Sequence, residues 1–186
     1  MNHTLQLKKA LDYAKRISKR LEHNYIGTEH LLLGFMHAYE SLAARILDDE
    51  GVDEDHVMQL IRDLIAPGNS IAVMERDGFT PKRMQVLSRA GEEAAAAGAD
   101  KIGTEHALMA MLRISDCAGA RLLSSMDVNL QKMFNQIVAS MGADGEVYRE
   151  EMARRSRRGY GFGDSSGSLE QYTKDMTALA AEGRLD

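Results

Sequence analysis

The sequence predicts an all-α protein of eight helices, arranged as two pseudo-symmetric four-helix repeats and followed by a flexible linker. Hydrophobic residues make up 44% of the 186 positions, whereas aromatic residues make up only 5% of all positions and Trp is absent. This composition favours helices over sheets. The two prolines, Pro67 and Pro81, leave long windows free for helix. The motif Ile-Gly-Thr-Glu-His at Ile26–His30 recurs unchanged at Ile102–His106, an offset of 76 residues (102 − 26), which indicates a structural unit built twice.

The repeat extends far beyond the motif, because a shift of 76 residues keeps matching without a gap. We therefore expect residues 1–66 and 79–141 to be two repeats of one compact domain, joined by an exposed loop at 67–78. Matches spread this widely argue for duplication of a whole unit rather than of a short motif. The matched pairs are Thr4 and Thr80, Leu11 and Leu87, Ala14 and Ala90, Ala44 and Ala120, Leu47 and Leu123, Val52 and Val128, and Ile61 and Ile137.

Four helices are expected in the first repeat. Apolar residues at three- and four-residue steps predict the first one as an amphipathic helix. Thr28 is the expected N-cap of the second helix and Asp53 that of the fourth, while Gly51 is a typical residue just past the end of the third. The expected ranges are about Leu7–Leu21, Thr28–Met36, Ser41–Glu50 and Asp53–Leu64.

The second repeat follows the same plan. Thr80 is an expected N-cap, and Pro81 behind it is favoured at the first helical position. Thr104 is expected to cap the next helix. The last two helices are expected at 118–126 and 129–141.

From Gly142 the helical periodicity ends. A basic run at 154–158 and a stretch rich in Gly and Ser at 159–168 lead us to expect a flexible linker over 142–168. Residues 169–186 regain some apolar spacing, too little to fold alone, and are expected to begin a further module.

The bulk properties exclude several functions. A net charge of −5 and a pI near 5.7 argue against a nucleic-acid partner. No window resembles a signal peptide or a membrane span, and the single Cys117 fits a reducing compartment, so we expect a cytoplasmic monomer without a membrane partner. Residues 1–66 carry 8 basic and 11 acidic residues and residues 79–141 carry 7 and 6, so any two equivalent sites need not bind equally.

The candidate binding residues are Glu29, Glu105, Thr4 and Thr80. Each glutamate lies in the first turn of its helix, where the helix dipole favours a carboxylate; at a surface corner it could also accept a bidentate hydrogen bond from a guanidinium. Each threonine opens the first helix of its repeat. It could act as a cap alone, or the free amides at that helix start could hold an anion such as phosphate.

Other polar residues are expected to be structural. His30 and His106 are expected to lie half-buried beside a helix start, bonded to backbone. A metal site is not expected, because no second histidine follows at metalloprotease spacing. Cys117 is expected in the core at a helix start. The chain has no P-loop motif, so we expect no catalytic residue and no ATP hydrolysis; an enzyme using Cys117 or the histidines is the alternative.

The doubled motif, its 76-residue offset and the Thr80-Pro81 helix start resemble the amino-terminal repeat domain of Clp ATPases, most closely the ClpC type, over about residues 3–141. The tail at 172–186 resembles the lead-in to the first ATPase module of that family. The resemblance implies eight helices in two repeats. It also implies a docking role for adaptor proteins and substrates of an unfoldase that feeds the ClpP protease.

The resemblance further implies recognition of phosphoarginine, with Glu29, Glu105, Thr4 and Thr80 as the site residues. It implies no cofactor for this part of the chain, with ATP and Mg²⁺ belonging to the longer protein. A free-standing helical adaptor or regulator without an ATPase stays open as the alternative. A P-loop in the sequence following Asp186 would decide in favour of the unfoldase.

Overall fold

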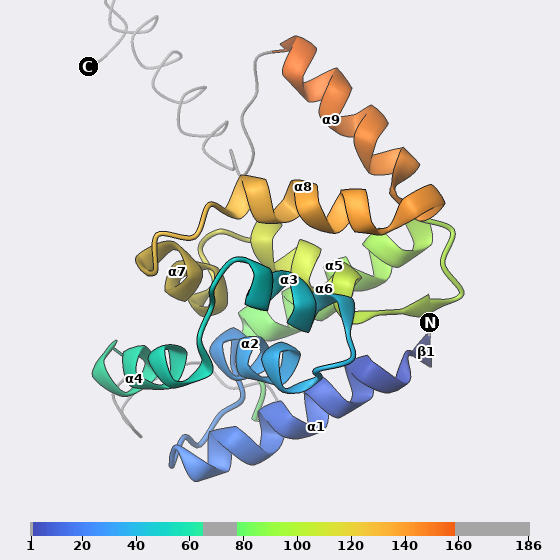
Figure 1. The fold of residues 1–186 in the computed structure, drawn as a ribbon. Helices are drawn as coiled ribbons and strands as arrows, with labels where there is room; N and C mark the ends of the chain where they lie inside the picture. The colour runs from blue at the N-terminus through green and yellow to red at the C-terminus, as the bar shows by residue number, and fades with distance from the viewer. Residues whose placement is uncertain (1, 65–77, 159–186) are drawn as a thin grey trace, which may run out of the picture.

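The computed structural model describes residues 2–64 and 78–158, and this part of the chain is almost entirely helical (Figure 1). Two very short strands and one 3₁₀ turn, η1, accompany the helices. The elements in chain order are β1 (Asn2–His3), α1 (Leu5–Arg20), α2 (Thr28–His37), α3 (Leu42–Asp49), α4 (Glu54–Leu64), α5 (Pro81–Ala96), β2 (Lys101–Ile102), α6 (Thr104–Arg113), α7 (Ala118–Ser125), α8 (Leu130–Ser140), η1 (Gly142–Gly145) and α9 (Glu146–Arg158). The predicted all-α fold class is confirmed.

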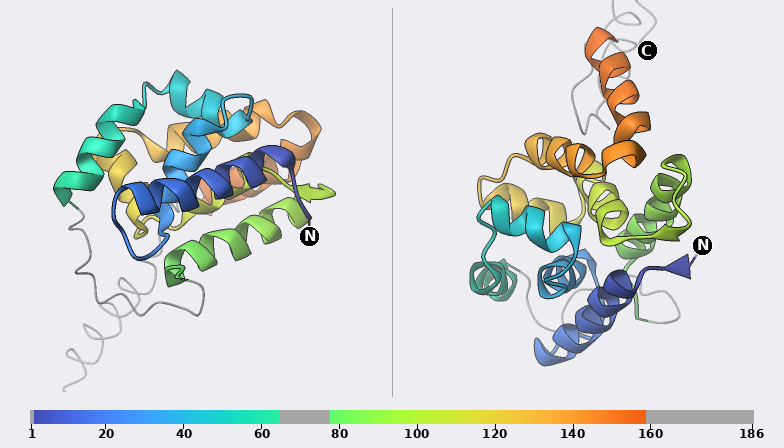
Figure 2. Two further views of the ribbon diagram at one scale, coloured as in Figure 1. Left: turned by 90° about the horizontal axis from the view of Figure 1, so that it is seen from below. Right: turned by 45° about the vertical axis from the view of Figure 1, so that its right-hand side comes forward.

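Helices α2 and α6 form the centre of the molecule. Residues 28–36 of α2 are all buried, and so are eight of the ten residues of α6. A helix that is apolar on all sides must be surrounded by other elements. The remaining helices of each repeat pack around these two, and the two views of Figure 2 show them wrapped about that centre.

The two repeats are joined by crossed backbone contacts. Strand β1 pairs in parallel with β2, so the start of α1 lies beside the segment that follows α5. Ile26, which follows α1, forms a bridge to Phe79, which precedes α5. Consequently α1 and α5 run in opposite directions, as the left view of Figure 2 shows. Each repeat begins against the motif of the other.

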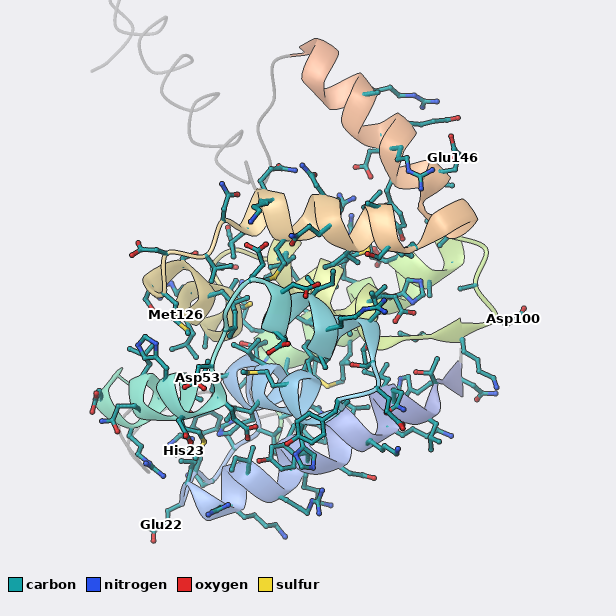
Figure 3. The ribbon with its side chains drawn as sticks, viewed as in Figure 1. Glu22, His23, Asp53, Asp100, Met126 and Glu146 are labelled. Carbon is teal, nitrogen blue, oxygen red and sulfur yellow. The ribbon has the colours of Figure 1, made fainter. Side chains whose placement is uncertain are left out.

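The turn after α1 carries a strain that its counterpart after α5 avoids. Glu22 adopts a φ of 59°, whereas Gly98, 76 residues later, adopts 70°. This left-handed conformation costs a residue with a Cβ about 1–2 kcal/mol but costs glycine nothing. Figure 3 labels Glu22 and His23 at this end of α1. The turn leads His23 back toward the start of α2.

Gly34 lets α1 and α2 approach each other closely. A Cβ at this position would collide with the carbonyl oxygen of Ala10 in α1. The equivalent residue of the second repeat is Ala110, which is fully buried. The close approach of α1 and α2 thus depends on a glycine that the second repeat does not have at the equivalent position.

The helix caps agree with the sequence prediction at Thr4, Thr80 and Asp53 but not at Thr28 and Thr104. The structure places Gly27 and Gly103 at the N-cap positions instead. Thr28 lies one residue inside α2, and its Oγ1 accepts a hydrogen bond from the Gly119 N–H at 3.0 Å. Its hydroxyl thus joins the two repeats rather than capping its own helix.

The predicted flexible linker at 142–168 begins instead with η1 and α9. Tyr148, only 1% exposed, donates its O–H to the Glu93 carbonyl oxygen at 2.6 Å. Arg113 pairs with Glu151 through both terminal nitrogens, at 3.1 and 2.7 Å. An aromatic anchor and a bidentate ion pair hold the first two turns of α9 against the second repeat, while the rest of the helix projects from the body (Figure 1).

Two expectations fall on residues that the structure does not describe. The inter-repeat loop at 67–78 lies almost wholly in the undescribed segment 65–77, and the end of the linker and the further module at 169–186 lie in 159–186. Within the described residues, no helix is both long enough and apolar enough to cross a membrane.

Candidate functional site

The structure brings the four predicted site residues together in crossed pairs. The Thr80 N–H donates to the carbonyl oxygen of Ile26 at 3.2 Å, which places Thr80 at the motif that contains Glu29. The Thr4 N–H donates to the carbonyl oxygen of Ile102 at 2.9 Å, at the motif that contains Glu105. We call these places the Thr80 corner and the Thr4 corner. Each corner combines the helix start of one repeat with the glutamate motif of the other.

Both threonines cap their helices as expected. Thr4 Oγ1 accepts the Leu7 N–H and Thr80 Oγ1 accepts the Arg83 N–H, each at 3.2 Å. Such a cap stabilises a helix by about 0.5–2 kcal/mol. In each cap the hydroxyl oxygen is the acceptor, so the cap does not use the O–H proton. An anion at these helix starts would meet that donor as well as the remaining backbone N–H groups.

Each glutamate side chain folds back over the glycine of its own motif. A Cβ at Gly27 would overlap the Glu29 carboxylate, and one at Gly103 would overlap that of Glu105. The glycine therefore leaves the room that the carboxylate occupies. A larger residue would push the carboxylate out of its place.

The two carboxylates differ strongly in exposure. The side chain of Glu105 is 23% exposed, whereas that of Glu29 is only 3% exposed, which contradicts the predicted surface corner for Glu29. Glu29 Oε1 makes no hydrogen bond. Burial raises the pKa of Glu29, and a backbone hydrogen bond and the side chain of Tyr25 offset this only in part. The Thr4 corner is the more open of the two.

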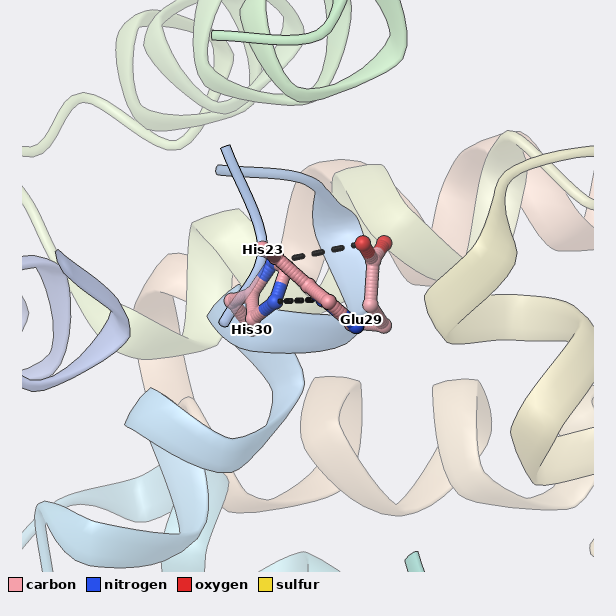
Figure 4. A group of neighbouring side chains, drawn as sticks. All are labelled: His23, Glu29 and His30. Atoms are coloured by element: carbon pink, nitrogen blue, oxygen red, sulfur yellow. Dashed lines mark hydrogen bonds and ion pairs between the residues drawn. The ribbon is translucent and has the colours of Figure 1, made fainter. Parts of the chain in front are cut away.

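His30 bonds to the backbone at the start of α2, as predicted, but its ring is fully buried rather than half-buried. Its Nδ1 accepts the Gly27 N–H at 3.0 Å, and its Nε2 lies 2.8 Å from His23 Nδ1 (Figure 4). Since Nδ1 accepts, the single ring proton of neutral His30 is on Nε2 and is donated to His23. Burial first, then His23 and Arg83, lower the pKa of His30 to about 3. His106 repeats the cap, accepting the Gly103 N–H at 3.0 Å.

His23, Glu29 and His30 form a buried group with metal-ligand atoms within 4.8 Å of one another. A metal ion needs a free lone pair on each ligand. Neither nitrogen of His30 offers one, because Nδ1 accepts from Gly27 and Nε2 carries the proton given to His23. Gly27, His30 and His23 form a hydrogen-bonded chain that fixes the ring of His30, and we assign the group no metal.

Cys117 is the N-cap residue of α7 and is fully buried, in agreement with the predicted core position. Its thiol donates to the carbonyl oxygen of Met111 at 3.7 Å. Burial raises its pKa, whereas a nucleophilic cysteine needs a lowered pKa. The thiol has the surroundings of a packing residue, which argues against the alternative of a cysteine enzyme.

Arg83 is the residue at the Thr80 corner that sequence reasoning missed. It is 5% exposed, and its Cζ lies 3.9 Å from the centroid of the Phe79 ring. Its Nε is buried without a hydrogen-bond partner. A signal was present in the sequence, because the 76-residue offset aligns Arg83 with the core residue Leu7. An arginine at a core position of one repeat marks a difference between the corners.

The burial of Arg83 is not compensated by an acidic partner within the described part of the chain. Burial lowers its pKa to about 10, and no neighbouring carboxylate counteracts this. The stack on Phe79 contributes about 0.5–2 kcal/mol, while removing a charge from water costs several kcal/mol. The stack on Phe79 therefore does not offset the cost of burying the Arg83 charge.

The comparisons with known proteins agree with this architecture. The Clp repeat (R) N-terminal domain family matches the chain twice, over residues 2–126 and 78–180. The ATP-dependent Clp protease ATP-binding subunit ClpC of Staphylococcus aureus (strain USA300) is 29% identical over 184 residues, covering 98% of this chain and 21% of its own length. The chaperone protein ClpB of Oceanobacillus iheyensis is 30% identical over 183 residues, covering 98% and 22%. The chain thus spans about a fifth of these curated relatives.

Two solved structures share the fold. The N-terminal domain of the chaperone ClpD from Arabidopsis thaliana has a TM-score of 0.63 at 18% identity, covering 75% of this chain and 97% of that one. The Hsp104 N-terminal domain from Candida albicans has a TM-score of 0.62 at 14% identity, covering 77% and 93%. With two matches that together span most of its length, the chain belongs to the Clp repeat N-terminal domain family.

Proposed function

We propose that this chain is the amino-terminal docking domain of an ATP-dependent Clp unfoldase. In this role it receives adaptor proteins and substrates for a ring that delivers them to ClpP. Family membership supports the docking role, and the ClpC relative, named as a protease ATP-binding subunit, supports the link to proteolysis. The ATPase modules and their ATP and Mg²⁺ would belong to the remainder of the protein.

The docking role extends to proteins marked with phosphoarginine. The observation that carries this proposal is the crossed geometry, which gives each corner both a threonine-capped helix start and a glutamate. A carboxylate suits a guanidinium and a helix start suits a phosphoryl group. Phosphoarginine has both groups in one side chain, so one corner could address its two ends.

The test is calorimetric titration of the 186-residue chain with a phosphoarginine peptide. The variants Glu29→Ala, Glu105→Ala and their combination measure the share of each corner, and Glu92→Ala on the exposed side of α5 is the matched control. We expect the double variant to lose binding and the control to keep it. Equal binding by wild type and double variant, or no binding by wild type, refutes the site assignment.

The unfoldase part of the proposal has its own test. The coding sequence beyond residue 186 should encode a P-loop within the next module, since ATP hydrolysis by this class of motor requires a phosphate-binding loop. A reading frame that continues without one favours the free-standing adaptor.

A further inference from the structure

The end of α2, the loop after it, α3 and the start of α4 enclose a hollow of about 620 Å³. Buried apolar residues form its base, and the exposed side chains of Asp48 and Asp53 lie at its rim. The buried residues of the base are Met36, Leu47 and Val52. An apolar centre with a polar rim is the composition of a protein–protein contact.

Tyr39 stands between this hollow and a second one of about 810 Å³ along α1, because it lines both. It is 72% exposed. Its ring lies 5.3 Å from the ring of His37, which itself stacks on Tyr13 at 3.7 Å. The tyrosine is thus held from one side and open on the other, and tyrosine is among the residues that contribute most to binding at protein interfaces.

The first hollow has a surplus of negative charge. Its lining contains one basic residue, Arg45, and four acidic ones, which are Glu40, Asp48, Asp53 and Glu54. Within the described part of the chain, only Glu40 among these four has an ion pair, with Lys9 at 3.7 Å. A positively charged partner is therefore complementary to this surface, whereas an acidic one is repelled.

The second repeat does not have these residues at the equivalent positions. The 76-residue offset aligns Tyr39 with Ser115. It aligns Asp48, Asp53 and Glu54 with Ser124, Asn129 and Leu130. The aromatic ring and three of the four carboxylates are therefore particular to the first repeat, where the scaffold alone does not require them.

The second repeat also shows that this end of the scaffold can receive a helix. The same offset aligns His37, which lines the hollow along α1, with Arg113. Arg113 is paired through both terminal nitrogens with Glu151 of α9. The second repeat is thus in contact with a segment of its own chain at this place, while the first repeat presents the open side of Tyr39.

We propose that the hollow beside Tyr39 docks a basic segment of a partner protein, in which an arginine or lysine stands next to an apolar side chain. The apolar side chain fills the base above Leu47. The cation lies on the ring of Tyr39 and pairs with the carboxylates of the rim.

The inference rests on the proposed function in its docking role, and it names a class of partner segment for that role. The segment needs no phosphoryl group. Its hollow lies at the opposite end of α2 from Glu29, since Glu29 is in the first turn of this helix and Tyr39 follows its last residue.

The test is fluorescence anisotropy of a fluorescein-labelled hexapeptide of alternating arginine and leucine, titrated with the 186-residue chain. A salt concentration of about 0.15 M limits attraction between net charges to about 8 Å. We expect saturable binding. Nuclear magnetic resonance of the labelled chain should show that the amides of Tyr39 and Val52 shift as the peptide binds.

Two variants copy the second repeat at the hollow. Tyr39→Ser removes the ring, and Asp48→Ser combined with Asp53→Asn removes two charges of the rim. Each should weaken binding of the peptide about fivefold or more. Asparagine can still accept the His56 N–H that Asp53 accepts at 2.8 Å, so the start of α4 stays capped.

The matched control removes two exposed charges elsewhere. Glu92→Gln in α5, combined with Asp100→Asn, should bind as the wild type does; Figure 3 labels Asp53 and Asp100 on different sides of the molecule. A peptide of alternating arginine and alanine should bind about fivefold more weakly, because it lacks the apolar side chain. A peptide of alternating glutamate and leucine should not bind.

Several results would overturn the proposal. They are no binding by the wild type, undiminished binding by Tyr39→Ser, or a loss in the control variant equal to that in the rim variant. Equal binding of the leucine and alanine peptides would also overturn it, because the base of the hollow would then play no part.

The variants Glu29→Ala and Glu105→Ala separate this inference from the proposed function. Their combination should bind the basic peptide as the wild type does, and Tyr39→Ser should bind a phosphoarginine peptide as the wild type does. Loss of phosphoarginine recognition with intact docking at Tyr39 leaves the inference standing. Phosphoarginine binding without any binding of the basic peptide overturns the inference and leaves the proposed function intact.

Discussion

The buried ring of His30 predicts a defined loss of stability in mild acid. Its pKa is lowered to about 3, first by burial and then by His23 and Arg83, whereas the unfolded chain has the ordinary value of 6.5. Between these values the unfolded state binds a proton that the folded state does not. Stability is therefore fully present above pH 6.5 and falls as the pH drops through this window.

The magnitude follows from the width of the window. Where the unfolded state binds one proton more than the folded state, each pH unit of acidification lowers the free energy of unfolding by about 1.4 kcal/mol. Two units, from pH 6.5 to 4.5, therefore cost about 2.7 kcal/mol through His30. Domains have a total stability of about 5–15 kcal/mol, so this loss is readily measured. His23, whose pKa burial also lowers, acts in the same direction.

The assay is urea unfolding, followed by circular dichroism between pH 7.5 and 4.5. His30→Gln keeps an oxygen that can accept the Gly27 N–H, as in a capping box, but does not titrate. We expect the variant to lose about 2.7 kcal/mol less than the wild type over this range. His56→Gln, at an exposed position of α4, should follow the wild type. Parallel curves for wild type and His30→Gln would refute a neutral, buried His30.

Two further substitutions test the packing of the fold. Tyr148→Phe removes the donor to the Glu93 carbonyl oxygen and should cost about 1 kcal/mol in urea unfolding; an unchanged midpoint would mean that α9 is not anchored there. Gly34→Ala drives a Cβ into the Ala10 carbonyl oxygen and should cost more than about 2 kcal/mol. Gly91→Ala, whose Cβ meets only ordinary contacts, should stabilise α5 by up to about 1 kcal/mol, and equal effects of the two glycine changes would contradict this view of the helix crossing.

Much of the fold could be predicted because its signals are local. The apolar spacing between Leu7 and Leu21 encodes an amphipathic helix, and Thr80 followed by Pro81 encodes a helix start. The caps at Thr28 and Thr104 could not be placed correctly, since Gly27 and Gly103 can occupy the same role. The choice between adjacent positions depends on the packed partner, here Gly119 for Thr28.

The helix α9 was missed for a related reason. Tyr148 stands alone in a polar segment and forms no periodic face with its neighbours. Its partners, Glu93 and Phe134, lie 55 and 14 residues away along the chain (148 − 93 and 148 − 134). Only the assembled second repeat brings them together, so a pattern search within the segment indicates a linker.

The sequence by itself determined that this protein is a duplicated helical unit and which residue types each copy repeats. The tertiary structure decided which residues share a corner, because the two repeats pack reciprocally and Thr80 meets Ile26 rather than its own motif. It also decided that Glu29 is enclosed while Glu105 is open, and that Arg83 is buried without an acidic partner. Periodicity specifies which face of a helix is apolar, but accessibility and charge balance depend on contacts between distant segments, and these exist only after both copies have packed.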